Sequence, residues 1–270
     1  MRRWSEAQRL TGKKIGFVPT MGALHQGHLD LVKRAQKVSD AVVVSIFVNP
    51  TQFAANEDLS RYPRDIKKDC KACREIGVDA IFMPDAADIY AADSSVWVIE
   101  ESLSQNWCGT SRPTHFRGVC TVVAKLFNIV QPQTAVFGQK DFQQVAVLRQ
   151  VTRDLHFPIK IVMAPITREP DGLAMSSRNV YLSPQERENG LGLYKALQLA
   201  QKCFAQDEKN VISLSKKIET ALQSHNLKID YVAIADNKTL EPVKTVKAGN
   251  VILLAAYAGK TRLIDNAILR

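Results

Sequence analysis

The chain has 270 residues, of which 46% are hydrophobic and 23% charged, the ordinary balance of a soluble globular protein. It lacks a run of the roughly 18 to 20 apolar residues that a membrane span needs, and it lacks an apolar leader, so we expect a cytoplasmic protein without a membrane partner. The net charge of +9 is compatible with nucleic-acid binding, but lysine and arginine are spread along the chain without a basic tract interleaved with aromatic residues. We therefore expect no nucleic-acid partner.

The first predicted elements are a buried strand over residues 13–18, a turn containing Gly22, and a helix over about residues 27–38. The apolar residues of the first stretch are nearly continuous, whereas those of the third recur at helical spacing. A strand, turn and helix in this order aim backbone N–H groups and the positive end of the helix dipole at one point. We expect an anionic ligand there.

Two histidines lie at this junction. His25 and His28 are three residues apart, a spacing that places both imidazoles on one side of a helical first turn. Gly22 and Gly27 remove side chains where a nucleotide would have to come close. Ordinary polar surface is one alternative; zinc binding is another, although no further ligands follow at a recognisable spacing.

Residues 41–48 form a nearly continuous β-branched run, which predicts a strand of a parallel sheet buried on both faces. The preceding helix would then connect two parallel strands. Asn49 and Gln52 follow the strand, and ligands of open α/β sheets bind beyond the carboxyl ends of strands. Both amides are therefore placed to contact a substrate, or else they are loop amides in water.

A helix is predicted over residues 66–76, and its many basic residues indicate that it is exposed. It carries Cys70 and Cys73, whose C-x-x-C spacing is typical of half a zinc site, but no second pair follows. The five cysteines of the chain are an odd, scattered set, which argues against a disulfide framework. We expect structural cysteines and no protein-bound metal.

The middle of the chain predicts strands over residues 80–83 and 96–100. The segment 112–119 then leads into an apolar helix. His115 and Arg117 in this segment either orient an acidic substrate or anchor the loop.

Residues 134–137 predict the next buried strand, which a glycine and a lysine follow before another helix. Gly138 allows close approach of a ligand to the backbone, and Lys140 supplies a point charge for phosphate. Asp141 either caps the helix or hydrogen-bonds a nucleotide.

After a further strand over residues 159–163, the polar stretch 166–179 contains a Pro-Asp-Gly turn and is either a linker or a functional loop. Beyond it, the patterns predict helices over 184–205 and 210–225 and strands over 229–235, 250–257 and 261–268. The sequence thus predicts an α/β fold with two domains. These are a Rossmann-like parallel-sheet domain over residues 1–168, which contains the predicted nucleotide site, and a smaller α+β domain over residues 169–270, which is expected to cover that site as a lid.

The H-x-G-H string at residues 25–28 resembles the signature of the nucleotidylyltransferase superfamily. Within it, the longer run over residues 19–28 is similar to that of the pantothenate synthetase (pantoate–β-alanine ligase) family. The resemblance extends to N-P-x-Q-F at 49–53, H-F-R-G-V at 115–119, F-G-x-K-D-x-x-Q at 137–144 and T-R-L-I-D-N at 261–266. Gln139 stands where many relatives carry glutamate.

The resemblance implies an ATP-dependent ligase with Mg²⁺. Pantoate would attack the α-phosphate of ATP to give pantoyl adenylate and pyrophosphate, and β-alanine would then displace AMP to give pantothenate. Attack at phosphorus needs positioning and charge neutralisation more than a covalent nucleophile. Family members are typically homodimers, so a homodimer is expected here.

The resemblance also implies a set of site residues. The catalytic residues are His25, His28, Lys140 and Arg178, and Arg178 belongs to a mobile loop that contacts phosphate. ATP is expected to contact Met21, Gly22, Ala23, Leu24, His25, Gln26, Gly27, His28, Gly138, Gln139, Lys140, Asp141, Thr167, Met175, Ser176, Ser177 and Arg178. Pantoate is expected at Gln52 and Gln144, and β-alanine at Gln52. Asp69 matches a position where some relatives carry a magnesium-associated carboxylate, but Lys68 and Ala72 do not continue that pattern, so no metal ligand is assigned.

Two rival functions remain at this point. A cytidylyl- or adenylyltransferase acting on a phosphorylated substrate would share the histidines but would not need Gln52 and Gln144. A non-catalytic nucleotide- or RNA-binding protein would bind ATP without releasing pyrophosphate.

Overall fold

The computed structural model describes residues 1–55 and 57–270, which form two compact units. The N-terminal unit comprises Met1–Gln105, Arg112–Gln139 and Gln144–Pro165. The C-terminal unit comprises Asn106–Ser111, Lys140–Gln143 and Ile166–Arg270. Two short segments from earlier in the chain therefore belong to the second unit.

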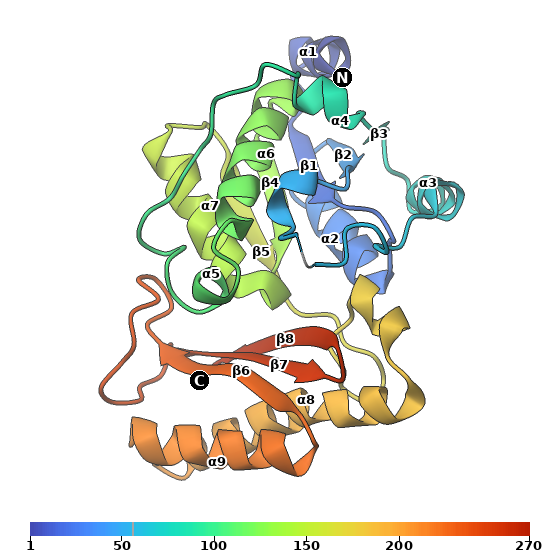
Figure 1. The fold of residues 1–270 in the computed structure, drawn as a ribbon. Coiled ribbons are helices and arrows are strands. Elements are labelled where there is room, and N and C mark those ends of the chain that lie inside the picture. Colours follow the sequence, from blue (N-terminus) through green and yellow to red (C-terminus); the bar gives the residue numbers. More distant parts are fainter. Residues whose placement is uncertain (56) are drawn as a thin grey trace. The chain divides into compact units, whose positions relative to one another are not determined.

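A parallel sheet forms the centre of the N-terminal unit (Figure 1). In the described residues it has five strands in the order β3-β2-β1-β4-β5. The strands are β1 (Ile15–Thr20), β2 (Ala41–Ile46), β3 (Ala80–Phe82), β4 (Thr134–Gly138) and β5 (Lys160–Ala164). The chain runs outward from β1 to β3 and then restarts at β4 on the other side of β1. This reversal confirms the predicted α/β class, and it marks the carboxyl ends of β1 and β4 as the edge where such sheets bind ligands.

Successive residues of the strands pack into two different hydrophobic clusters. On one face Phe17 packs against Phe127 of α6 (His115–Val130), with ring centroids 6.5 Å apart. On the other face Val18 clusters with Val32 of α2 (Gln26–Gln36) and Cys73 of α3 (Ile66–Glu75). Both faces of the sheet are thus covered, as the β-branched strands predict.

The remaining elements connected with this unit are short or lie at its edges. They are α1 (Arg2–Leu10), the 3₁₀ turns η1 (Pro50–Gln52) and η2 (Gln139–Asp141), α4 (Ala86–Ile89) and α7 (Phe142–Asp154), whose first two residues belong to the C-terminal unit. The helix α1 was not predicted from the sequence; its Trp4 packs against the hydrophobic cluster to which α6 contributes.

Two sequence-based predictions need correction. Residues 96–100 are not a strand: the N–H of Val98 donates to Oγ1 of Thr121 on α6, and Trp97 stacks on Tyr90. The helix α3 is not exposed on all sides, because Cys70 and Cys73 are buried while its basic residues face solvent.

The C-terminal unit packs two helices against an antiparallel sheet. The strands β6 (Lys228–Ala235), β7 (Val251–Ala258) and β8 (Thr261–Ile268) pair in sequence order. The helices are α8 (Pro184–Ala205) and α9 (Val211–Ser224), and the shorter elements are α5 (Cys108–Ser111) and the 3₁₀ helix η3 (Ser177–Tyr181). Ser183 and Glu186 form a capping box that begins α8, with Pro184 at its first position.

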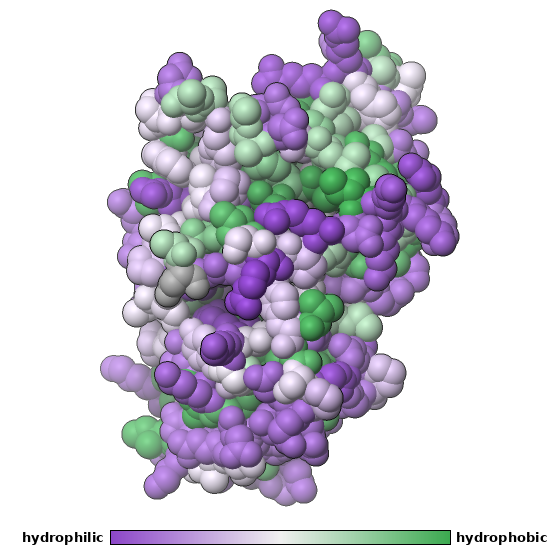
Figure 2. Space-filling model, turned by 45° about the vertical axis from the view of Figure 1, so that its right-hand side comes forward, coloured by the Kyte–Doolittle hydropathy of each residue, from purple (hydrophilic) through white to green (hydrophobic). Residues whose placement is uncertain are grey.

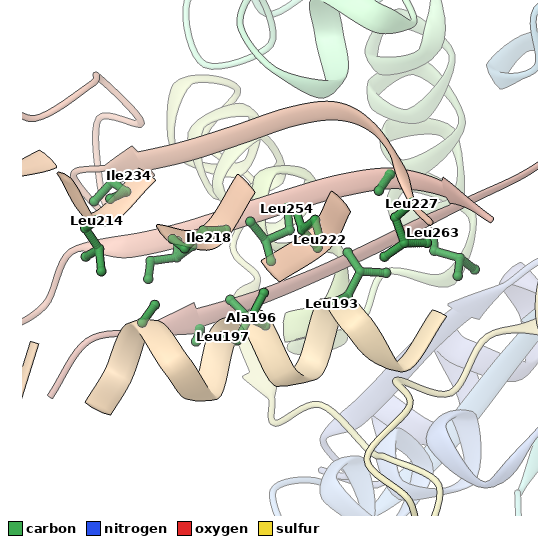
Figure 3. Packing of buried hydrophobic residues seen from close by; sticks show 14 of the residues in the cluster. Leu193, Ala196, Leu197, Leu214, Ile218, Leu222, Leu227, Ile234, Leu254 and Leu263 are labelled. Carbon is green, nitrogen blue, oxygen red and sulfur yellow. The ribbon is translucent and has the colours of Figure 1, made fainter. Parts of the chain in front are cut away.

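Apolar stripes on the two helices meet the sheet, as Figure 3 shows. Leu193 and Leu197 of α8 and Ile218 of α9 lie in one cluster with Leu254 of β7. The polar sides of these helices point outward, and the lower part of the surface in Figure 2 is predominantly hydrophilic. In the part of the chain that the structure describes, no helix has the length and apolar character required to cross a membrane.

Replacing Ile218 with alanine should lower the free energy of unfolding by about 2–5 kcal/mol, because it leaves a cavity in a closed core. Ile218 is 0% exposed. Ile212, on the same helix and 79% exposed, provides the matched control. Ile212→Ala should change stability by no more than about 0.5 kcal/mol. Equal losses in urea denaturation would contradict the packing described.

Candidate active site

His25 and His28 form the cap of α2 with their own side chains. Nδ1 of His25 accepts a hydrogen bond from the Gly27 N–H at 3.1 Å, and Nδ1 of His28 accepts one from the His25 N–H at 3.3 Å. A neutral imidazole that accepts at Nδ1 carries its hydrogen on Nε2. The ring centroids are 4.1 Å apart. The cap therefore sets both rings side by side as Nε2–H donors.

Several backbone N–H groups around these rings have acceptors within the chain. The Gly22 N–H donates to Oγ1 of Thr20, and the histidine rings take the N–H groups of His25 and Gly27.

The next two backbone N–H groups of the loop bond to a carboxylate on α3. The N–H of Ala23 donates to Oδ2 of Asp69 at 2.9 Å, and the N–H of Leu24 donates to Oδ1 at 2.8 Å. Asp69 is 2% exposed. Sequence reasoning missed this contact, although Asp69 shares the buried stripe of α3 with Cys70 and Cys73, and a carboxylate in such a stripe requires a partner.

Three further residues predicted to bind ATP are placed around the histidines. The Leu24 side chain lies in the hydrophobic core, and Gln26 is exposed, with its amide donating to Asp30 at 2.8 Å. Met21 lies at the carboxyl end of the sheet, where its Sδ accepts a hydrogen bond from Nε2 of Gln52 at 3.1 Å. The segment predicted to bind nucleotide thus touches the residue predicted to bind pantoate.

The buried amides of Asn49 and Gln52 hold one another in place. Nδ2 of Asn49 donates to Oε1 of Gln52 at 3.0 Å, and Oδ1 of Asn49 accepts from the hydroxyl groups of Thr51 and Tyr90. Asn49 is 1% exposed and Gln52 9%. The alternative that these are solvated loop amides is therefore wrong.

The start of α6 anchors this loop. Nδ1 of His115 donates to the Gln52 carbonyl at 2.9 Å, and the Arg112 guanidinium donates to the same oxygen at 3.2 Å. A Cβ at Gly118 would lie 2.4 Å from the Thr51 carbonyl oxygen, so only glycine lets the helix approach so closely. Arg117 stacks on Trp97, with its Cζ 4.5 Å from the ring centroid. These contacts favour the anchoring role over substrate orientation.

Beyond β4, the second predicted motif divides between the two units. Gly138 ends the strand, and a Cβ there would meet only Leu31, at 3.9 Å. Gln139 begins η2, and Gln144 lies half-buried on α7. These residues remain predicted contacts of ATP and pantoate.

Lys140 belongs to the C-terminal unit and is held there through its backbone. Its carbonyl accepts a hydrogen bond from Nδ2 of Asn266 on β8 at 3.0 Å. Its Nζ lies 3.8 Å from Oδ2 of Asp141, whose side chain is 48% exposed. The ammonium group is thus paired only loosely with its neighbour.

The loop over residues 166–179 folds back on itself as a small hairpin. The Met175 N–H donates to the Thr167 carbonyl at 3.0 Å, and Arg168 and Ala174 form an antiparallel bridge. This places two of the predicted ATP contacts side by side. The stretch Ser176, Ser177 and Arg178 is half-buried, and Oγ of Ser176 accepts from the Arg178 N–H at the start of η3.

Arg168 and the turn of the hairpin are tied to β8 and α8. Both guanidinium nitrogens of Arg168 donate to the carboxylate of Asp265, at 2.6 and 2.9 Å, and Asp265 is 3% exposed. The same guanidinium stacks on Tyr194, and a Cβ at Gly172 would lie 2.1 Å from that ring. Arg187 forms ion pairs with Glu169 and Asp171. The turn end of the hairpin is therefore more firmly attached than a simple linker.

Among the described residues, no group of three or more His, Cys, Asp or Glu side chains is arranged so that it could hold a metal ion. Both oxygens of Asp69 already accept backbone hydrogen bonds.

Comparison with known proteins gives consistent matches along the chain. The family model described as pantoate–β-alanine ligase matches residues 1–268. The chain is 53% identical to the pantothenate synthetase of Thermotoga neapolitana, over all of this chain and 96% of that protein. Its fold is similar to a crystal structure from Thermus thermophilus named pantoate–β-alanine (pantothenate synthetase), with a TM-score of 0.92, 46% identity and coverage of 94% and 93% of the two chains. A Francisella tularensis pantoate–β-alanine ligase, in a complex described as containing β-γ ATP and β-alanine, is similar at a TM-score of 0.82, with 36% identity and coverage of 98% and 94%.

Two buried thiols should resist alkylation in the native protein. Burial is the main cause that raises the pKa of Cys73 to about 11 and that of Cys120 to about 12, so both stay protonated at pH 8. Cys203, which is only partly buried, should react with iodoacetamide first, and all five cysteines should react after unfolding. Rapid labelling of Cys73 in native protein, followed by mass spectrometry, would contradict a structural role.

Proposed function

The chain belongs to the pantoate–β-alanine ligase family, and we propose that it carries out the reaction of that family on the residues described above. The carboxylate of (R)-pantoate attacks the α-phosphate of ATP, forming pantoyl adenylate as pyrophosphate leaves. The amine of β-alanine then attacks the acyl carbon, forming the amide bond of pantothenate as AMP leaves and a proton is released.

The observation that supports our assignment of the chemistry is the cap formed by His25 and His28. Both Nδ1 atoms accept backbone hydrogen bonds, so both Nε2–H groups are fixed donors. Preorganised donors of this kind stabilise the charge that develops on phosphate oxygens without reorganising during the reaction. Lys140 and Arg178 are proposed to add positive charge at the same phosphates.

We propose that Gln52 and Gln144 bind pantoate and that Gln52 also contacts β-alanine. The locked amide pair of Asn49 and Gln52 supports this proposal, because a buried, oriented amide selects a polar substrate strongly. The loop over residues 166–179 is proposed to contact the phosphates and to close over them.

Family membership argues against both rival functions. A transferase acting on a phosphorylated substrate, or a non-catalytic nucleotide-binding protein, would not account for a match that covers residues 1–268. We propose that ATP enters as its magnesium complex and that the protein is a cytoplasmic homodimer; for both statements the support is the resemblance to the family.

The direct test is product analysis with purified protein, ATP, Mg²⁺, pantoate and β-alanine. The full mixture should give pantothenate, AMP and pyrophosphate in equal amounts. Omitting β-alanine should leave a single turnover of pyrophosphate release and bound pantoyl adenylate. Pyrophosphate release that does not require pantoate would contradict the proposed substrate.

His25→Asn separates the role of His25 as a helix cap from its role as an Nε2–H donor to phosphate. Asparagine is a good helix cap, so stability should change by less than about 0.5 kcal/mol, but the Nε2–H donor is lost. The single-turnover rate of adenylate formation should fall by about 10²-fold or more, the usual effect of losing one such donor. A normal rate would refute the proposed role.

Arg178→Ala tests whether the loop over residues 166–179 acts on the ATP phosphates. Adenylate formation should slow by about 10²-fold because a planar cationic donor to phosphate is removed. The reaction of β-alanine with preformed pantoyl adenylate should be much less affected. If the first half-reaction is unchanged in rapid-quench measurements, the stretch is only a connection within the C-terminal unit.

A further inference from the structure

Asp69 is a buried carboxylate for which the proposed chemistry gives no role. It is 2% exposed, on a helix whose other buried residues include Cys70 and Cys73. An ionised carboxylate is stable in such a place only when its oxygens accept hydrogen bonds or pair with a charge. The hydrogen bonds that Asp69 accepts therefore indicate its role.

Both oxygens of Asp69 accept hydrogen bonds from consecutive residues of the histidine loop. Oδ2 accepts from Ala23 at 2.9 Å and Oδ1 from Leu24 at 2.8 Å. The backbone is unusual at this point: φ is +80° at Gly22 and +49° at Ala23, both in the left-handed region. A Cβ at Gly22 would lie 2.9 Å from Oδ2 of Asp69, so the carboxylate packs directly against the turn.

The next residue in the chain is His25. Its extended backbone, with φ −128° and ψ 174°, is what lets its ring turn back to cap Gly27. Because Asp69 holds the backbone at Ala23 and Leu24, it sets the direction in which the chain reaches His25, the residue that caps α2. Without Asp69, the N–H groups of Ala23 and Leu24 would lose the carboxylate that accepts from them, and the backbone that leads into the cap would no longer be held in one direction.

We propose that Asp69 is a positioning residue for the histidine pair, acting through the N–H groups of Ala23 and Leu24. This inference rests on the proposed role of the histidines in adenylyl transfer. Asp69 does not touch the substrates; it holds the loop so that the two imidazoles present their Nε2–H groups at a fixed place. Displacement of such groups by about 1 Å lowers a rate by up to about 10²-fold.

Asp69→Asn is the first test, because asparagine has the same shape but one acceptor oxygen, and its NH₂ group would face a backbone donor. The rate of adenylate formation should fall about 10- to 100-fold, with the KM for pantoate changed by less than about threefold. Asp79→Asn is the matched control: Oδ2 of Asp79 accepts from the Val42 N–H at 2.7 Å, near the amino end of β2, away from the histidine loop. This variant should keep near-normal rates.

A double-mutant cycle distinguishes positioning from general destabilisation. If Asp69 acts through the histidines, adding Asp69→Asn to a variant that carries both His25→Asn and His28→Asn should lower the rate by less than about threefold further, because both groups that it positions are already gone. If instead the rate losses of the Asp69 and histidine substitutions multiply, the proposal is overturned. Restoration of the single variant by higher Mg²⁺ would also overturn it, since that result would indicate a metal ligand.

A measurement on the wild-type protein keeps the proposal testable if Asp69→Asn does not fold. The amides of Ala23 and Leu24 should exchange slowly with solvent and resonate at low field, as expected for bonds to a carboxylate. Rapid exchange at both would refute the proposed bonds. Normal activity of His25→Asn together with slow exchange would instead contradict the proposed function of the histidines, so the two failures can be told apart.

Discussion

The need to satisfy the backbone N–H groups between β1 and α2 shapes the N-terminal unit. A strand that ends in the core and a helix that begins a few residues later leave several donors without partners from regular secondary structure. Here side chains supply the acceptors: the hydroxyl of Thr20, the carboxylate of Asp69 and the two imidazoles. The imidazoles accept these backbone hydrogen bonds at Nδ1, so each ring carries its hydrogen on Nε2. The same hydrogen bonds therefore begin the helix and fix which ring nitrogen can donate.

Much of this arrangement could be predicted from the sequence, and the reasons are local. The β-branched run of β2 and the change of period after β1 are short-range patterns, and the three-residue spacing of His25 and His28 correctly predicted that their rings lie together. Family resemblance located the other motifs. The roles of Lys140, Arg178 and Gln144 remain predictions, because their geometry toward a substrate depends on ligands.

Other features depend on partners distant in the sequence, for which no periodic pattern exists. Asp69 lies among basic residues, so composition suggested a solvated helix, whereas its acceptors serve a loop 45 and 46 residues away. The stretch at 96–100 has the apolar composition of a strand, but its Trp97 packs against Tyr90 and Arg117 instead. The hydrogen bonds that Arg112 and His115 donate to the Gln52 carbonyl likewise could not be predicted, because the partners are 60 and 63 residues apart in the sequence.

Asp265 and Asn266 on β8 bind partners far earlier in the chain, and this affects the order in which the protein can fold during synthesis. Asn266 binds the carbonyl of Lys140 across 126 residues, and Asp265 holds Arg168 across 97. Asp69, in contrast, meets its partners within 46 residues. On the ribosome, the histidine loop can therefore acquire its anchor early, while Lys140 and the hairpin wait for a strand that emerges much later. A nascent chain stopped before β8 would therefore contain the anchor of its histidine loop but would lack the Asn266 side chain that binds the Lys140 carbonyl.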